Sequence, residues 1–179
     1  MNVIIQQVEY KHFGPCIRVS NDTCDLWVMT GCGPRVIRYS LKDRENVFAE
    51  LAKEGFETPD GYWYMHGGHR LWHSPEAMPR TYTLDAEPVQ WSAIENGVRT
   101  VQKPGKDGMR KEMDIVMDKD ATLVSITHRI FNQTPWPVEF SVWALSVMAP
   151  DGVSIVPQNR RDSGLLPNRN SLLAVYGCK

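Results

Sequence analysis

Histidine, arginine and tryptophan side chains gather in one short stretch of the sequence, YMHGGHRLWHSPE, residues 64–76. It holds three of the chain's five histidines, His66, His69 and His73. Imidazole can exchange a proton near neutral pH or bind a metal, arginine donates several hydrogen bonds, and indole covers an apolar surface. These residue types therefore allow a metal site, an acid–base site or a sugar-binding surface.

A metal site is the least favoured of the three. On an extended chain His69 and His73 point to the same face, whereas His66 points away. A helix would align all three imidazoles, but Gly67-Gly68 disfavours a long helix at this place. We therefore predict no bound metal, and nothing else in the sequence indicates a cofactor.

Aromatic residues and a carboxylate flank the histidines. Indole faces, imidazoles and guanidinium groups are what a sugar ring and its hydroxyls need, so we expect a small-molecule carbohydrate to bind here. The predicted ligand-binding residues are His66, His69, Arg70, Trp72 and Trp63. If the site is also catalytic, the predicted proton-transfer residues are His66, His73 and Glu76.

The bulk composition narrows the classes of partner. Lysine and arginine number 20 against 21 acidic residues, a net charge of -1, so no long-range field favours nucleic acid or an anionic membrane. No apolar run approaches the ~20 residues that span a bilayer, and the N-terminus lacks a signal-peptide pattern. We expect a cytoplasmic protein without nucleic-acid or membrane partners. The 4 cysteines are too few for a disulfide scaffold.

Strand-forming patterns recur along the chain, and helical patterns hardly occur. Short runs rich in β-branched and aromatic residues are separated by Gly, Pro, Asn or Asp. The runs are NVIIQQVEY (2–10), CIRVSN (16–21), LWVMT (26–30), RVIRYSL (35–41), VQWSAIEN (89–96), VRTVQ (98–102), MRKEMDIVMD (109–118), TLVSITHRIFN (122–132) and VEFSVWALSVMA (138–149). We predict a single all-β domain over residues 1–179.

Three segments carry more specific predictions. Asn96-Gly97 suits a tight turn that joins the runs on either side of it into a hairpin. Residues 138–149 form a nearly unbroken apolar run, for which we expect a central strand covered on both faces. Residues 45–56 have the only helical pattern, with Gly55 as its C-terminal stop, although the same residues also fit a strand and a loop.

Three segments resemble the galactose mutarotase-like superfamily, whose β-supersandwich proteins include the aldose 1-epimerases. They are GCGPRVIRYSLKDRENVFAE (31–50), HGGHRLWHSPE (66–76) and HRIFNQTPWPVEFSVWALSVMAPDGVSIVPQ (128–158), which together span most of the chain. The GGHRLW motif at residues 67–72 is similar to that of a bacterial branch. The resemblance implies an antiparallel β-supersandwich, incomplete at its C-terminus, with affinity for carbohydrate.

The catalytic residues that the resemblance implies are matched only in part. His66-Gly67-Gly68 matches a segment whose histidine contacts the sugar in aldose 1-epimerases. The strand at residues 142–150 has no histidine at the place of the family's general acid, and the general base has no counterpart that can be placed. Ring opening of an aldose needs both groups. The resemblance therefore favours carbohydrate binding, and a substitute acid–base pair would make the protein an epimerase or mutarotase.

Other readings stay open beside this one. The chain stops short of the family's usual domain, and SLLAVYG (171–177) has no following strand to pair with, so we expect a homodimer that covers the open edge. Arg160, Arg161 and Arg169 could hold a sugar phosphate.

Cys32 could be a nucleophile, although its glycine neighbours favour a turn. A non-catalytic assembly module with structural histidines is the alternative from a different class.

Overall fold

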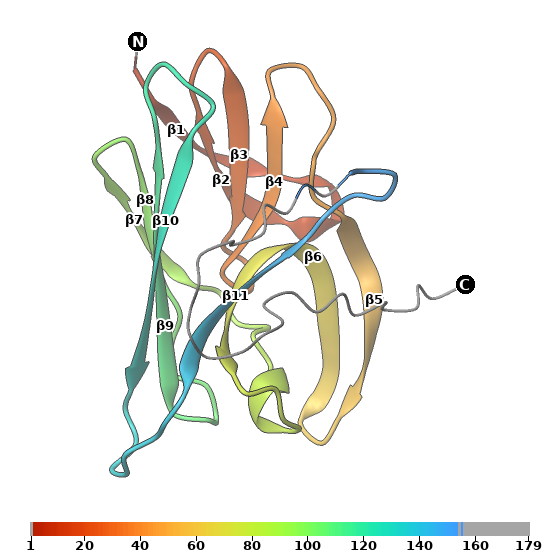
Figure 1. The fold of residues 1–179 in the computed structure, drawn as a ribbon, viewed down its shortest axis with the longest axis vertical. Coiled ribbons are helices and arrows are strands. Elements are labelled where there is room, and N and C mark those ends of the chain that lie inside the picture. The colour runs from red at the N-terminus through yellow and green to blue at the C-terminus, as the bar shows by residue number, and fades with distance from the viewer. Residues whose placement is uncertain (1, 154, 156–179) are drawn as a thin grey trace, which may run out of the picture.

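The chain folds into two antiparallel β-sheets that pack face to face (Figure 1). The computed structural model describes residues 2–153 and 155. The larger sheet has the spatial order β1 (Ile4–Glu9), β2 (Pro15–Ser20), β3 (Cys24–Met29), β4 (Arg35–Leu41), β6 (Gly61–Ser74) and β11 (Ser141–Val147), and β5 (Glu50–Thr58) pairs with β6 beside this path. The smaller sheet has the order β10 (Val124–Asn132), β9 (Met109–Met117), β8 (Gly97–Val101) and β7 (Gln90–Ile94). The all-β antiparallel sandwich is confirmed.

The main core lies between the two sheets. Strand β9 alternates buried and half-buried residues along its whole length, as expected for a strand with one face on a core. Its Met113 and Ile115 pack with residues of β2 and β3 such as Ile17 and Leu26, and with Leu71 of β6. Each such side chain contributes roughly 1.5–3 kcal/mol through burial. This core fixes how the second half of β6 faces the smaller sheet.

Two short 3-10 helices, η1 (Lys11–Phe13) and η2 (Arg80–Tyr82), interrupt the strands. In the described part of the chain, no helix has the length and apolar character needed to cross a membrane. The predicted hairpin is present as β7 and β8. Ile94 pairs with Gly97, so its two turn residues are Glu95 and Asn96, one position earlier than predicted.

The predicted helix at residues 45–56 is wrong. Its second half forms β5, which pairs along the first half of β6. The reason is the close approach of the two backbones, since a Cβ atom on Gly55 would lie 2.1 Å from the carbonyl oxygen of Trp63. Gly55 therefore permits strand pairing and does not end a helix.

The apolar run at residues 138–149 is a strand, but it does not have the expected central position. Its core, β11, pairs with β6 on one side, and among the described residues no strand pairs with its other side. Val142 is 52% exposed. Composition indicated a strand here but could not indicate how many neighbours it has. The segment at residues 171–177 and the arginines at 160, 161 and 169 lie outside the described residues.

Strand β6 bends sharply in its middle and thereby forms an arch. His66, Gly67 and Gly68 have positive φ angles of 56°, 84° and 66°. The first arm pairs with β5, and the second pairs with β11 and touches β4 through His69. Figure 1 shows the yellow arch with η2 between its arms. The histidine-rich stretch is therefore the bend and the second arm of one long strand.

Candidate functional site

The inside of the β6 arch holds an arginine between two tryptophans. Trp63 from the first arm and Trp72 from the second have ring centroids 5.7 Å apart. The guanidinium carbon of Arg70 lies 4.8 Å from the Trp63 ring centroid and 4.3 Å from that of Trp72. Tyr82 of η2 packs edge-on against both indoles. Aromatic side chains thus flank the guanidinium, an arrangement that cation–π attraction stabilises.

Arg70 is only 5% exposed, and its Nε and Nη1 atoms have no hydrogen-bond partner among the described residues. Arg35, at the start of β4, is 0% exposed and donates from Nη2 to Oδ2 of Asp85 over 2.7 Å. Its Nε and Nη1 atoms also have no partner. Burial, and then the charge of Arg35, lower the pKa of Arg70 to about 10. Two cationic groups with unpaired donors therefore lie within electrostatic reach of each other.

His66 sits at the bend of the arch, next to residues from β6 and from other elements. Its Nε2 atom is 3.7 Å from Sγ of Cys32, and its ring stacks on Tyr64 at 5.5 Å between centroids. Burial, followed by the positive charge of Arg35, lowers the pKa of His66 to about 4. The imidazole is therefore neutral at pH 7 and lacks the proton that a general acid must deliver.

His69 points away from the arginines and links the two sheets. Its Nδ1 atom is 2.8 Å from Oγ of Ser146 on β11, and its Nε2 atom is 2.8 Å from Nε2 of His128 on β10. Burial, and then the charge of His128, lower its pKa to about 4. Beside it lies a cavity of about 490 Å³ with a mostly apolar lining that includes Phe48 and Ile126. His69 therefore contacts Ser146 and His128, whereas His66 contacts Cys32 and Tyr64.

His73 is buried near the end of the second arm. Its Nδ1 atom is 3.8 Å from Oδ2 of Asp107, and neither ring nitrogen has a hydrogen-bond partner. Burial, followed by the charge of Lys111, lowers its pKa. Glu76 is exposed and accepts a hydrogen bond from the hydroxyl of Tyr82. The three predicted proton-transfer residues, His66, His73 and Glu76, therefore have different neighbours and do not face one common space.

The predicted ligand-binding residues therefore do not form one accessible surface. Trp63, Arg70 and Trp72 fill the arch and are nearly inaccessible, while His69 lies toward the other sheet. The two glycines of the stretch serve the bend, because a Cβ on Gly68 would lie 2.3 Å from the carbonyl oxygen of Val36. Much of the stretch that looked like a binding surface is therefore structural.

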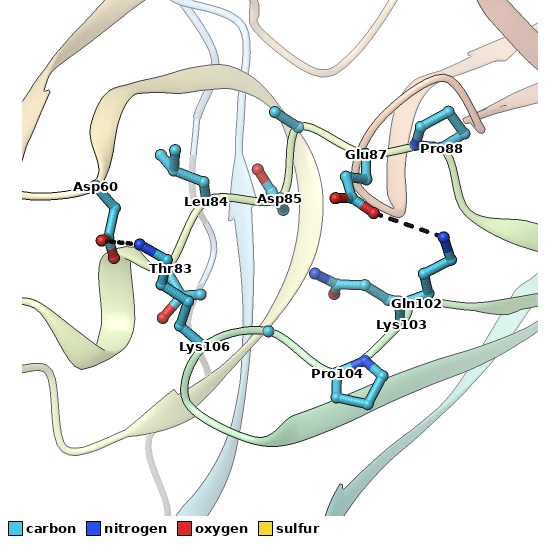
Figure 2. A pocket seen from close by; sticks show the side chains of 12 residues that line it. Asp60, Thr83, Leu84, Asp85, Glu87, Pro88, Gln102, Lys103, Pro104 and Lys106 are labelled. Atoms are coloured by element: carbon cyan, nitrogen blue, oxygen red, sulfur yellow. Dashed lines mark hydrogen bonds and ion pairs between the residues drawn. The ribbon is translucent and has the colours of Figure 1, made fainter.

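A cavity of about 390 Å³ opens beside these residues at the end of the sandwich. Its walls are the segment 83–88, which precedes β7, and the segment 102–106, which joins β8 to β9. Asp85 lies on one wall and Gln102 on the other, and Figure 2 shows the Gln102 amide extending into the space between them. An ion pair between Lys103 and Glu87, 3.7 Å long, connects the two walls (Figure 2). At the other end of the cavity Lys106 pairs with Asp60, which lies in the turn between β5 and β6 (Figure 2).

A second cavity, of about 320 Å³, adjoins the first. Both are lined by Asp60, Thr83 and Lys106, and the second also includes His73 and Asp107. The two cavities together bring carboxylates, amines, an amide and an imidazole to one end of the molecule.

Asp85 connects the first cavity to the arginines. It lines the cavity, pairs with Arg35, and acts electrostatically on Arg70 and on Lys111 of β9. Lys111 is 7% exposed, and burial lowers its pKa below the ordinary lysine value. The carboxylates of Asp107 and Asp85 oppose this shift only in part. We call Arg35, Arg70, Lys111, Asp85 and Asp107 the buried charge cluster. It contains three basic side chains and two carboxylates, and Arg70 has no ion pair with a described residue.

Sequence patterns did not indicate the residues of the cavity. Asp85, Gln102 and Lys103 belong to no motif, and they lie in connections whose meeting depends on the packing of both sheets. The only local signal was the GKDG segment at residues 105–108, which suits a hairpin tip and does end the β8–β9 connection.

Cys32 lies in the bend before β4, as its glycine neighbours indicated. Burial, and then the charge of Asp85, raise the pKa of its thiol, which disfavours the thiolate that a nucleophile needs. Within residues 2–153 and 155, no three His, Cys, Asp or Glu side chains are grouped so that they could hold a metal ion.

Comparisons with protein-family models, with curated proteins and with solved structures found no match to this chain.

Proposed function

We propose that this protein binds a carbohydrate in the cavity between segments 83–88 and 102–106. The observation that carries the proposal is the cavity's lining, in which the Gln102 amide extends inward, Asp85 lies on the opposite wall, and apolar side chains such as Leu84 and Pro104 lie beside them (Figure 2). A planar carboxylate accepts two hydrogen bonds and an amide both donates and accepts, which suits neighbouring sugar hydroxyls. A volume of about 390 Å³ lies within the range of small-molecule sites.

The arrangement of the titratable groups favours binding over epimerisation by the residues of the histidine-rich stretch. Ring opening requires an acid and a base on opposite sides of one sugar ring. His66 and Glu76 have no neighbour in common, and His66 is neutral at pH 7. These two residues therefore do not form a substitute acid–base pair.

Sugar epimerisation is a second candidate because of His73 and Asp107. Both are buried and both line the adjoining cavity, so a sugar that extended from the first cavity would meet an imidazole and a carboxylate. Neither ring nitrogen of His73 has a hydrogen bond to a described residue, so either could bond to such a ligand.

Proton NMR on a panel of freshly dissolved aldoses and uronates tests the proposal and separates the two candidates. We expect at least one sugar to show line-broadening with the wild type and no acceleration of mutarotation. In Gln102→Ala the affinity should fall about tenfold, which corresponds to the loss of one or two hydrogen bonds. The matched control is Gln6→Ala, because Gln6 is exposed on β1 and does not line this cavity.

The other outcomes are equally informative. Mutarotation that is accelerated by the wild type, and not by His73→Ala, would replace the binding proposal with the epimerase. If folded protein broadens the lines of no sugar, carbohydrate binding is contradicted and the structural assembly module becomes the better account.

A further inference from the structure

The buried charge cluster contains more hydrogen-bond donors than acceptors. Within the part of the chain that the structure describes, Nε and Nη1 of both Arg35 and Arg70 are unpaired, and both side chains are at least nine-tenths buried. Nδ1 of His66 is also buried without a partner, and His66 interacts electrostatically with both arginines. Buried guanidinium groups are normally paired, because an unpaired one loses its hydration without compensation.

The excess of donors coincides with an excess of positive charge. Within the cluster, Asp85 is the acceptor that pairs with Arg35, and Arg70 has no ion pair with a described residue. Arg70 keeps its positive charge at pH 7, because its pKa is lowered only to about 10, and no described carboxylate neutralises it. A single negative charge brought by a ligand would balance it.

From these donors and charges we infer that the carbohydrate is acidic and that its carboxylate is bound by Arg35 and Arg70. The inference rests on the proposed function, since the sugar ring would occupy the cavity that Asp85 lines. Asp85 is the point where the cavity and the cluster meet, because its carboxylate is 20% exposed and is paired with Arg35. The acid group enters beside Asp85, and the cations around it outweigh the repulsion between the two carboxylates.

The surroundings of Arg70 favour a carboxylate over a phosphate. Trp63 and Trp72 both lie against the guanidinium, so its free donors lie at the edge of the group. Nε and Nη1 lie on different edges of the guanidinium plane, so the two oxygens of a planar carboxylate would accept one hydrogen bond from Arg70 and one from Arg35. A tetrahedral phosphate would place further oxygens against the indoles, where they would find no donors from Arg70.

Isothermal titration calorimetry on the full chain at pH 7 tests the inference. The ligands are D-glucuronate and D-galacturonate, the neutral sugars D-glucose and D-galactose, acetate as a carboxylate without a sugar, and D-glucose 6-phosphate. We expect one uronate to bind at least about tenfold more tightly than its neutral counterpart and than acetate. Arg70→Lys keeps the charge but loses the planar guanidinium, so it should remove most of this preference. Arg99→Lys on β8 is the matched control.

Each result has one meaning. Equal binding of uronate and neutral sugar would overturn the acidic-sugar inference and leave carbohydrate binding intact. Equal binding of acetate and uronate would overturn carbohydrate binding itself, and tighter binding of the sugar phosphate would overturn the choice of carboxylate. If no compound binds, both proposals fail. The comparison among ligands uses the wild type, so it remains decisive even if Arg70→Lys does not fold.

Discussion

Lowering the pH from 7 to 5 is expected to destabilise the fold strongly. Burial is the first cause that lowers the pKa values of His66 and His69, both to about 4, and it also lowers those of His73 and His128. The unfolded chain has ordinary histidine pKa values near 6.5, so between pH 6.5 and 4 it binds more protons than the folded chain. The histidine contribution to stability is therefore complete above pH 6.5 and is lost as the pH falls toward 4.

The size of the loss in folding stability follows from the pKa shifts of the histidines. Each pKa unit corresponds to about 1.4 kcal/mol, and solvent screening of these partly buried imidazoles reduces the loss by pH 5 to roughly 1 kcal/mol for each of His66 and His69. Urea unfolding at a series of pH values measures it. His69→Gln should reduce the pH dependence of the unfolding free energy, because one of the groups that is protonated on unfolding is removed. A free energy of unfolding that stayed constant between pH 7 and 5 would show that these imidazoles are not buried as described.

Gly68→Ala is expected to destabilise the protein by about 3 kcal/mol or more, because the new Cβ would meet the backbone of β4. The ideal Cβ position is 2.3 Å from the carbonyl oxygen of Val36, and φ is 66°. A backbone carbonyl cannot move aside as the end of a side chain can. The bend of β6 would therefore have to open, and the contacts between Trp63 and Trp72 would be disturbed.

Gly14→Ala is the matched control for this experiment. Gly14 has a φ of 72°, close to that of Gly68, but no atom lies within 4 Å of the ideal Cβ position. The loss of stability in Gly14→Ala should be limited to the conformational strain of alanine at a positive φ, about 1 kcal/mol. Thermal or urea unfolding compares the two variants. If both cost the same, the close packing of the bend against β4 is not what requires glycine.

The sequence was a good guide to the strands and a poor guide to the site. Alternation along β9 indicated its buried face, because a strand's side chains report directly on the two faces of a sheet. Residues 45–56 were ambiguous, since helical spacing of a few apolar residues also fits a strand whose partner is distant in the sequence. Pairing with β6, which no local pattern indicates, decided the outcome.

The candidate site was only half predictable for a related reason. Residue types identified Arg70 and the tryptophans as a group, and they do lie together. Spacing could not indicate the bend at Gly67-Gly68, which brings Trp63 back onto Trp72 and buries both. Arg35 and Asp85 were missed because a buried ion pair between distant segments has no local pattern.

Mapping of backbone amide shifts by NMR during titration with a uronate and with its neutral counterpart tests carbohydrate binding in the cavity most directly. The account predicts that the shifts concentrate at Asp85, Gln102 and Lys103, with further shifts near Arg35 for the uronate alone. Shifts concentrated around the apolar cavity beside His69, or no shifts with either sugar, would contradict it.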